Sequence, residues 1–334
     1  MRLCILAHEK FPDDAKTAVG VLRYSDHEVV AVLDRDCPSR RVSECIDGVQ
    51  DAPIVGSVAD APDFDALLIG IAPIGGGFDD SWRPDVRAAI NSGADVISGL
   101  HYFLSEDPEF RTLAADLGVD LRDVRKPPAD LTVSEGIARE LDAEIVLTVG
   151  TDCSTGKMTT TLELLEAARD RGLDAGFVPT GQTGIVIDGS GIAVDRTISD
   201  FAAGAVERMC VERSEHDYLF VEGQGSIVHP AYSAVTCGIL HGSMPDHLVL
   251  CHEAGRETIH GYDAFEIPAP GRVAELYLDL ADSVAPTNLL GGALNTSHLD
   301  KPAADGALDA YSEAIDAPAV DPVRTDAAAL VDRL

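Results

Sequence analysis

Short apolar runs alternate with segments of helical periodicity along the whole chain. Nine such runs predict strands, at residues 3–7, 29–33, 66–71, 95–98, 144–150, 175–179, 218–221, 247–251 and 291–294. Helices are predicted between them, for example where apolar residues recur at 158, 162, 165 and 168 and Gly172 follows as an end signal. Strands that alternate with helices are typical of parallel sheets covered by helices. The pattern therefore predicts an α/β protein whose sheets are mostly parallel.

A break at residues 125–136 (RKPPADLTVSEG) divides this pattern in two. Pro127 and Pro128 can continue neither a helix nor a central strand. Ser134 is a suitable N-cap for a new helix that reaches about residue 141. We therefore expect two domains, residues 1–133 and 134–334. Within the second, the Asp-Gly-Ser-Gly run at 188–191 separates two apolar runs and predicts the tip of a β-hairpin.

The charge of the chain narrows the classes of partner. There are 57 Asp and Glu against 25 Lys and Arg in 334 residues, which gives a formal net charge of −32. Such a surface repels a polyanion, so we expect no nucleic-acid partner. Lysine occurs only at positions 10, 16, 126, 157 and 301. Many carboxylates with few lysines resemble the cytoplasmic proteins of salt-accumulating halophiles, in which molar salt screens the self-repulsion.

The apolar segments and the cysteines indicate where the protein works. The N-terminal run is short and is cut off by charged residues, and no stretch of 18 apolar residues occurs. We therefore expect no signal peptide, no membrane association and a cytoplasmic location. Seven cysteines, an odd number without CxxC pairs, predict reduced thiols in the cores, with neither disulfides nor a zinc site.

The strongest chemical signal is the segment GTDCSTGKMTT at residues 150–160. It follows an apolar strand and opens a helix, which is the context of a phosphate-binding P-loop. In such a loop backbone amides surround phosphate oxygens and a lysine, here Lys157, neutralises their charge. Two positions depart from the usual pattern: Thr151 replaces the first glycine, and Met158 stands where Ser or Thr normally reaches magnesium. The predicted binding residues are Gly150, Thr151, Asp152, Cys153, Ser154, Thr155, Gly156, Lys157, Met158 and Thr159.

Thr159 carries the nearest hydroxyl that could replace the magnesium-binding Ser or Thr, and other candidate metal ligands follow later in the chain. The loop entrance Gly-Thr-Asp and the segment LFVEGQGS at 219–226 are similar to dethiobiotin synthetase and its P-loop relatives. This resemblance makes Glu222 a candidate magnesium ligand at the end of a strand. Asp195 is a further candidate, unless it only flanks the helix that begins near residue 199. Val178 stands where those synthetases carry lysine, so carboxylation of a diamine is not expected.

A second resemblance covers most of the chain. The segments at 97–109 (ISGLHYFLSEDPE), 123–128 (DVRKPP), 179–185 (PTGQTGI), 221–232 (VEGQGSIVHPAY), 250–256 (LCHEAGR) and 294–299 (LNTSHL) resemble a two-domain family known as domain of unknown function 1611. The resemblance implies a Rossmann-like N-terminal domain and a P-loop NTPase-like C-terminal domain. It also implies N-acetylation of D-glutamate, or of D-amino acids more broadly, with acetyl-CoA.

Acetyl transfer needs a base, hydrogen-bond donors for the oxyanion and a cation for the amino-acid carboxylates. His252 and Glu253 are candidates for the base, Arg256 for the carboxylate clamp, and Gln182 for an oxyanion donor. A histidine at a strand end is often structural, and this alternative applies to His252 and also to His101.

Two other functions fit the P-loop. Lys157, Thr159 and Glu222 alone would also serve an ATP- and magnesium-dependent ligase or kinase of a small carboxylate, which is the second hypothesis. The third hypothesis is a regulatory protein that binds a nucleotide without turnover. Under the first hypothesis the partner is a small amino-acid substrate, with acetyl-CoA or ATP as the phosphate-bearing ligand. The prevalence of symmetric assemblies among soluble enzymes favours a homo-oligomer.

Overall fold

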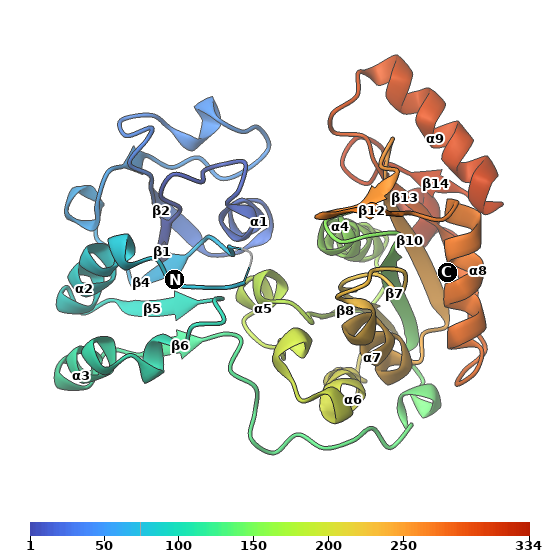
Figure 1. Ribbon diagram of the computed structural model, residues 1–334, viewed down its shortest axis with the longest axis horizontal. Coiled ribbons are helices and arrows are strands. Elements are labelled where there is room, and N and C mark those ends of the chain that lie inside the picture. Colours follow the sequence, from blue (N-terminus) through green and yellow to red (C-terminus); the bar gives the residue numbers. More distant parts are fainter. Residues whose placement is uncertain (74) are drawn as a thin grey trace. The chain divides into compact units, whose positions relative to one another are not determined.

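The computed structural model describes residues 1–73 and 75–334, and its internal contacts divide the chain into two compact units (Figure 1). Unit 1 contains Met1–Pro127 and Gln182–Arg196, and unit 2 contains Pro128–Gly181 and Thr197–Leu334. Residues 182–196 thus leave unit 2 and return to it, an excursion that the division at residue 133 does not contain. Helix α5 (Gln182–Asp188) makes this excursion and packs on α1 (Lys16–Tyr24).

Unit 1 is built on a six-stranded sheet in which every pair of neighbours is parallel. The order is β3-β2-β1-β4-β5-β6, which is the order of dinucleotide-binding folds. The strands are β1 (Arg2–Leu6), β2 (Glu28–Leu33), β3 (Ile54–Val55), β4 (Ala66–Ile69), β5 (Asp95–Ser98) and β6 (Leu121–Asp123). The helices are α1, α2 (Arg83–Asn91), α3 (Pro108–Leu117) and α5, with single 3-10 turns at Val42–Glu44, Val58–Asp60, Asp80–Trp82, Leu104–Glu106 and Val194–Arg196.

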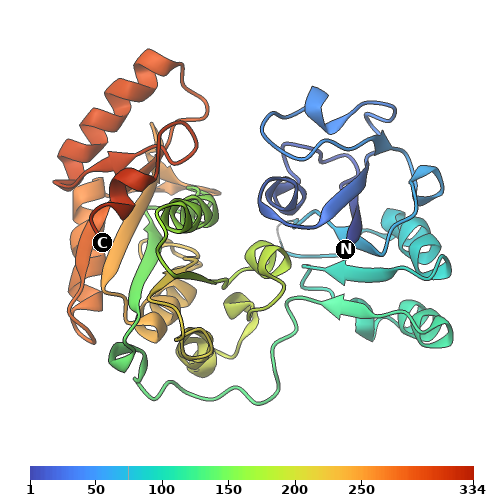
Figure 2. The same ribbon diagram turned by 180° about the vertical axis from the view of Figure 1, so that it is seen from behind.

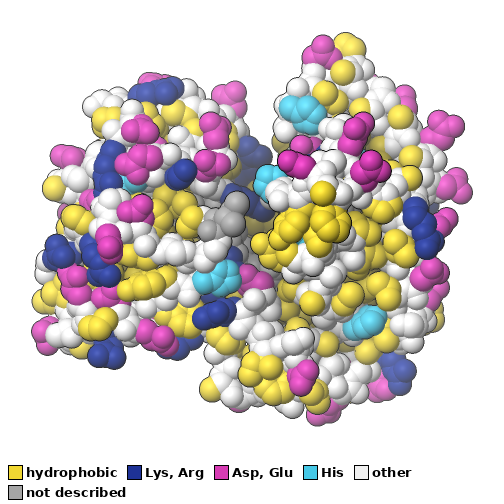
Figure 3. Space-filling model, viewed as in Figure 1, with side chains coloured by type: hydrophobic (Ala, Val, Ile, Leu, Met, Phe, Trp, Pro, Cys, Tyr) yellow, Lys and Arg dark blue, Asp and Glu magenta, His cyan; other side chains and the backbone are white. Residues whose placement is uncertain are grey.

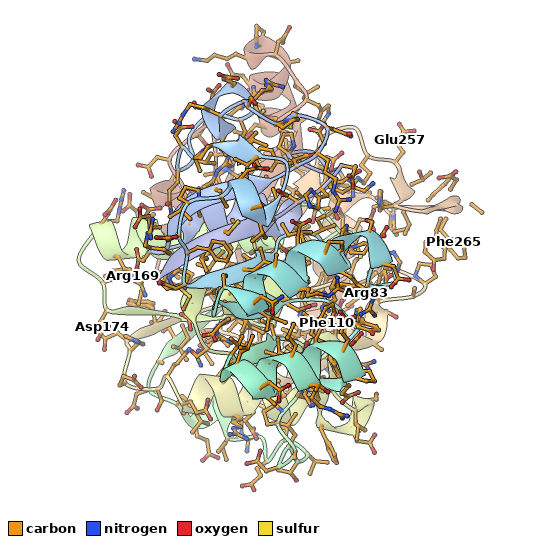
Figure 4. All side chains as sticks on the ribbon, turned by 90° about the vertical axis from the view of Figure 1, so that its left-hand side faces the viewer. Arg83, Phe110, Arg169, Asp174, Glu257 and Phe265 are labelled. Carbon is orange, nitrogen blue, oxygen red and sulfur yellow. The ribbon has the colours of Figure 1, made fainter. Side chains whose placement is uncertain are left out.

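A cation joins α2 to α3 at the edge of unit 1. The Arg83 guanidinium lies 4.9 Å from the ring centroid of Phe110 and pairs with Asp107 at 2.6 Å (Figure 4). The hydrogen bond to Asp107 raises the pKa of Arg83. Burial alone would raise the pKa of Asp107, but hydrogen bonds from Arg83 and Tyr102 outweigh it and lower this pKa to about 2. The pair is therefore fully charged at neutral pH and fastens the two helices beside β5 and β6.

Unit 2 has a second six-stranded parallel sheet, in the order β14-β13-β10-β7-β9-β8. Its strands are β7 (Glu144–Gly150), β8 (Ala175–Val178), β9 (Tyr218–Val221), β10 (His247–Glu253), β13 (Asn288–Asn295) and β14 (Ala319–Val320), and β11 (Thr258–Ile259) forms an antiparallel hairpin with β12 (Tyr262–Glu266). Its helices are α4 (Lys157–Asp170), α6 (Ala202–Val211), α7 (Ser233–Ser243), α8 (Pro270–Ala281), α9 (Lys301–Ile315) and α10 (Ala328–Val331), with 3-10 turns at Ala138–Glu140 and Ser199–Phe201.

Helices cover both faces of the unit 2 sheet. Adjacent glycines in β13 show this, because Gly291 lies against Leu330 of α10 and Gly292 against Tyr311 of α9. Successive residues of a strand point to opposite faces. Helix α4 contacts α10 on one face, and α8 contacts α9 on the other; Figures 1 and 2 show α4 and α8 on opposite sides of the sheet. The central strand β7 is consequently buried along its length after its first residue.

The predicted α/β class and parallel sheets are confirmed, and all nine predicted strands are present with ends that differ by a few residues at most. Two local predictions are wrong. Residues 188–191 do not form a hairpin tip, because the preceding apolar residues Ile185 and Val186 are buried on a helix that ends at Asp188. Ser134 does not cap a helix, because its hydroxyl donates to Glu207, whose carboxylate also accepts from the amides of Glu135 and Ile137.

The surface and the thiols bear on the expected environment. Carboxylate side chains are scattered over the face shown in Figure 3 and do not gather in one patch. The seven cysteines are free thiols, and Cys4, Cys210 and Cys251 are buried. In the part of the chain that the structure describes, none of the helices combines the length and apolar character that a membrane crossing requires.

Candidate functional site

The predicted P-loop lies between β7 and α4 in unit 2. Gly150 ends the strand, residues 151–156 turn, and Lys157 begins a helix of 14 residues. Gly156 caps this helix with φ +97°, a left-handed conformation that suits glycine. The first amides of the helix therefore face the loop, where their partial positive charge favours an anion.

Lys157 is buried and lies across the loop. Its ammonium donates to the carbonyl oxygen of Asp152 at 2.7 Å and lies 3.5 Å from the hydroxyl of Thr155. A Cβ at position 150 would lie 2.8 Å from Nζ, so glycine at the strand end makes room for the lysine. The ammonium is therefore fixed inside the loop, where a phosphate group would meet it.

Asp152 holds the loop together from within. Its carboxylate is fully buried and accepts from the amides of Cys153 at 2.6 Å and His260 at 2.8 Å. It also accepts from the Arg256 guanidinium at 3.2 Å, and Arg256 donates to the Cys153 carbonyl at 2.7 Å. A buried carboxylate is costly unless it is paired, and Arg256 supplies the pairing charge. Arg256 thus connects the loop after β10 to the P-loop.

His252, Glu253 and Arg256 come together with the P-loop as neighbours, as their positions in the sequence suggest. Nδ1 of His252 lies 2.8 Å from the hydroxyl of Thr151, and the ring stacks on Tyr311 with centroids 5.6 Å apart. Burial, and then the positive charge of Arg256, lower the pKa of His252 to about 4, although Asp152 raises it. The imidazole is therefore neutral at pH 7, the state that a general base requires. Glu253 forms an ion pair with Arg256.

A pocket opens beside these residues. It has a volume of about 360 Å³ and is lined by His252, Arg256, residues 257–258 and residues 266–270. The β11–β12 hairpin forms part of its wall, and Glu257 and Phe265 mark the hairpin in Figure 4. The pocket gives a small molecule access to the imidazole of His252 at the carboxyl end of the sheet, where parallel α/β folds bind ligands.

Comparisons with known proteins agree with this architecture. Family models match residues 35–127 as a Rossmann-like domain and residues 132–331 as a P-loop domain, both described as domain of unknown function DUF1611. The chain belongs to the DUF1611 family. The predicted resemblance to this family, and the predicted Rossmann-like and P-loop domains, are confirmed.

The chain is also similar over most of its length to a protein of solved structure and to two named proteins. A DUF1611 protein from Anabaena variabilis shares 40% identity and a TM-score of 0.95, with 99% of this chain and 98% of that chain covered. A protein of Tritonibacter scottomollicae named D-glutamate N-acetyltransferase is 36% identical over 96% of this chain and 94% of its own length. A protein of the same name from Pseudoalteromonas is 36% identical over 80% of each chain.

The predicted magnesium ligands lie in different surroundings. Glu222 is buried in unit 2, and one carboxylate oxygen accepts from the amides of Thr180 at 3.2 Å and Gly181 at 3.0 Å. Thr159 lies half-buried on α4, and Met158 packs into the core. Asp195 belongs to unit 1, where it pairs with Arg125. A carboxylate engaged with amides, a methionine in the hydroxyl position and a carboxylate paired with arginine fit a magnesium ion poorly.

Gln182 also belongs to unit 1 and is held there by Arg125. The side-chain oxygen of Gln182 accepts from the Arg125 guanidinium at 2.7 Å, and Arg125 donates to the Gly99 carbonyl at 2.6 Å. Nε2 of His101 lies 3.8 Å from Asp195 in the same cluster. Arg125 is buried. The residues of this cluster thus position one another within unit 1, and the proposed role of Gln182 as an oxyanion donor stays a prediction.

Reasoning from the sequence did not single out one residue of the site, His229. It lies in the segment 221–232, which carries part of the family resemblance, and its ring is buried. Nε2 of His229 is 4.0 Å from a carboxylate oxygen of Asp152. A histidine four residues beyond Gly225 in a glycine-rich strand end was the available signal, because such turns bring side chains to the edge where ligands bind.

Proposed function

We propose that this protein is an N-acetyltransferase that moves the acetyl group of acetyl-CoA to the amine of a D-amino acid such as D-glutamate. The observation that carries the proposal is the P-loop with its buried Lys157 next to the neutral imidazole of His252 and an open pocket. The names of two relatives, 36% identical to this chain, support the choice of reaction.

In this proposal the P-loop binds the phosphates of coenzyme A. The ammonium of Lys157 and the first amides of α4 supply positive potential within one loop. Arg256 offsets the charge of Asp152, which would otherwise oppose an anion. The pocket of about 360 Å³ beside His252 then accommodates the acyl end of the donor or the amino acid.

His252 is the proposed general base. The amine nitrogen of the amino acid attacks the thioester carbonyl carbon, an N–C bond forms and the C–S bond breaks. The amine loses one proton to the imidazole, and the departing thiolate takes up one proton to leave as free coenzyme A. A base with pKa about 4 is neutral throughout the physiological range. Glu253 is the second candidate, although its pairing with Arg256 lowers its availability.

The alternative function, an ATP- and magnesium-dependent ligase or kinase, uses the same lysine. It needs a metal held beside the phosphates, and the surroundings of Glu222 and Met158 described above do not favour one. No step of the proposed transfer passes through magnesium. A regulatory protein that binds a nucleotide without turnover is the remaining alternative.

One assay separates the three functions. The purified protein is incubated in molar KCl with D-glutamate and either acetyl-CoA or Mg-ATP, and free thiol and inorganic phosphate are measured. We expect thiol release that depends on D-glutamate and is unaffected by EDTA. Phosphate release without thiol release would replace the transferase by the ligase or kinase. Release of neither product would leave the regulatory function.

A further inference from the structure

His229 has a buried ring nitrogen that no described residue satisfies. Its side chain is fully buried, and Nε2 has no hydrogen-bond partner among the residues that the structure describes. The nearest charged oxygen, on Asp152, is 4.0 Å away, which is too far for a hydrogen bond. Leaving a buried polar atom unsatisfied destabilises the folded protein. Such an atom beside a P-loop points to a ligand.

The other ring nitrogen determines what Nε2 can do. Nδ1 accepts from two backbone amides, those of Ala231 at 3.0 Å and Tyr232 at 3.3 Å. An atom that accepts two hydrogen bonds carries no proton itself, so in the neutral ring the proton is on Nε2. Burial lowers the pKa of His229, and the positive charge of Lys157 lowers it further, against Asp152, so the neutral ring is favoured. Nε2 is therefore a donor.

This tautomer argues against a metal at the same place. Ligand atoms of Asp152, Cys153 and His229 lie within 4.8 Å of one another, a grouping that would otherwise suggest a cation. A metal needs the lone pair of Nε2, which moves the proton of the neutral ring to Nδ1. That proton would then face the two amide hydrogens that now bond to Nδ1. The partner that Nε2 lacks is an acceptor.

The ring is also held rigidly in this orientation. Tyr232 packs on it with centroids 4.6 Å apart, and Tyr262 of the hairpin meets it edge-on at 5.2 Å. A donor fixed in this way keeps its direction before the ligand arrives, and such preorganisation strengthens binding. Lys157 and His229 both lie beside Asp152 of the loop: the ammonium donates to the Asp152 carbonyl oxygen at 2.7 Å, and Nε2 of His229 is 4.0 Å from its carboxylate.

We propose that Nε2–H of His229 donates a hydrogen bond to a phosphate oxygen of the ligand in the P-loop. With Lys157 it provides one neutral and one charged donor for the same phosphate group. The assignment of that phosphate to coenzyme A rests on the proposed function; the donor role itself does not, because it applies to any phosphate in the loop.

Two substitutions separate the two ring nitrogens. His229→Asn places an amide oxygen near the position of Nδ1, so it keeps an acceptor for the amides of Ala231 and Tyr232 but lacks the distal donor. His229→Gln places an amide NH₂ near the position of Nε2 but loses the acceptor. Calorimetry with coenzyme A and with inorganic pyrophosphate should show affinities about 10- to 150-fold weaker for His229→Asn, the range for losing a hydrogen bond to a charged group. His229→Gln should recover part of this loss while melting at a lower temperature.

The assay of transfer distinguishes a phosphate from the acyl oxygen as the acceptor. His229→Asn should lower kcat/KM for acetyl-CoA and leave kcat/KM for acetyl-pantetheine, which lacks the pyrophosphate, unchanged. Equal losses with both donors would assign Nε2–H to the thioester oxygen and overturn the proposal. Wild-type affinity of His229→Asn for coenzyme A and pyrophosphate would also overturn it.

The tautomer of His229 can be tested directly, and the outcomes of the binding and transfer assays separate this inference from the proposed function. The ¹⁵N shifts of His229 should show a protonated Nε2 and an unprotonated Nδ1; stoichiometric Zn²⁺ binding that His229→Asn abolishes would contradict this assignment. If the protein binds pyrophosphate through His229 but transfers no acetyl group, the proposed function fails and the donor role stands. If acetyl transfer is intact in His229→Asn, the donor role fails and the function stands.

Discussion

Replacing Lys157 by methionine tests whether the P-loop holds the phosphates of the acetyl donor. Methionine keeps an unbranched apolar stem of similar length and removes the ammonium. In the structure the ammonium donates to the Asp152 carbonyl at 2.7 Å inside the loop. Losing a hydrogen bond from a charged donor costs the fold about 1.5–3 kcal/mol. This is less than the free energy of unfolding of a typical domain, about 5–15 kcal/mol, so the variant should remain folded. The effect of the substitution should therefore appear in binding.

The magnitude follows from the type of bond lost. A hydrogen bond to a charged group contributes about 1.5–3 kcal/mol, and about 1.4 kcal/mol corresponds to a factor of ten. We expect kcat/KM for acetyl-CoA to fall about 10- to 150-fold in Lys157→Met. With acetyl-pantetheine as the donor, kcat/KM should stay within about twofold of the wild type, because no pyrophosphate is present to lose its partner.

The matched control is Lys301→Met. Lys301 is an exposed lysine at the start of α9 in the same unit, so its removal changes the net charge equally. Both kinetic constants should be unchanged in this variant. A similar loss with acetyl-CoA and acetyl-pantetheine in Lys157→Met, or no loss with either, would refute the assignment of the P-loop to the phosphates.

Three other predictions concern stability, measured by denaturant unfolding. Gly223→Ala should lower the free energy of unfolding by about 3 kcal/mol, because a Cβ there would overlap the carbonyl oxygen of Thr148. Gly306→Ala, in open space on α9, should raise it by about 0.5–1 kcal/mol. Similar values for both variants would contradict the close approach of Gly223 to Thr148. Glu207→Gln should lower the free energy of unfolding by about 1–3 kcal/mol, because only one side of an amide can accept the hydrogen bonds that both carboxylate oxygens now accept. An unchanged denaturation midpoint would show that these hydrogen bonds do not stabilise the fold. The pKa of His252 is about 4 in the folded protein and 6.5 as its ordinary value, so the unfolded chain binds the proton more tightly. The free energy of unfolding should therefore be unaffected by this group above pH 6.5 and should fall by about 3 kcal/mol in all as the pH is lowered to 4. His252→Asn should remove this part of the pH dependence. Identical profiles of stability against pH for the variant and the wild type would refute the pKa shift.

The sequence was sufficient where the signals are local. The P-loop could be predicted because a buried strand, a glycine turn, Lys157 and an amphipathic helix follow one another within about 25 residues. Its neighbours His252 and Arg256 could be proposed because parallel strands place their carboxyl ends at one edge of the sheet. The pairing of Arg256 with Asp152 could not, because it joins residues 104 positions apart and depends on the path of the loop after β10.

Distant contacts also explain the two wrong local predictions. Ser134 has the sequence of a helix cap, but Glu207, 73 residues later, takes its hydroxyl and the amides that follow it. Residues 188–191 have the sequence of a tight turn. However, α5, which ends at Asp188, packs on α1 and belongs to unit 1, although the residues on either side of this excursion belong to unit 2. In both cases tertiary packing overrides a local preference. His229 was missed for a different reason: its proposed role depends on which ring nitrogen the nearby amides of Ala231 and Tyr232 engage, and the sequence does not show this.

The central claim is acetyl transfer from acetyl-CoA to the amine of a D-amino acid. Acetyl-CoA labelled with ¹³C in the acetyl group, incubated with D-glutamate and the protein in molar KCl, tests it most directly when the product is identified by mass spectrometry and the thiol is titrated. We expect one labelled acetyl group on the glutamate nitrogen for each thiol released, and far less product with L-glutamate. Thiol release without labelled N-acetylglutamate, or no thiol release while Mg-ATP is consumed, would contradict the proposed function.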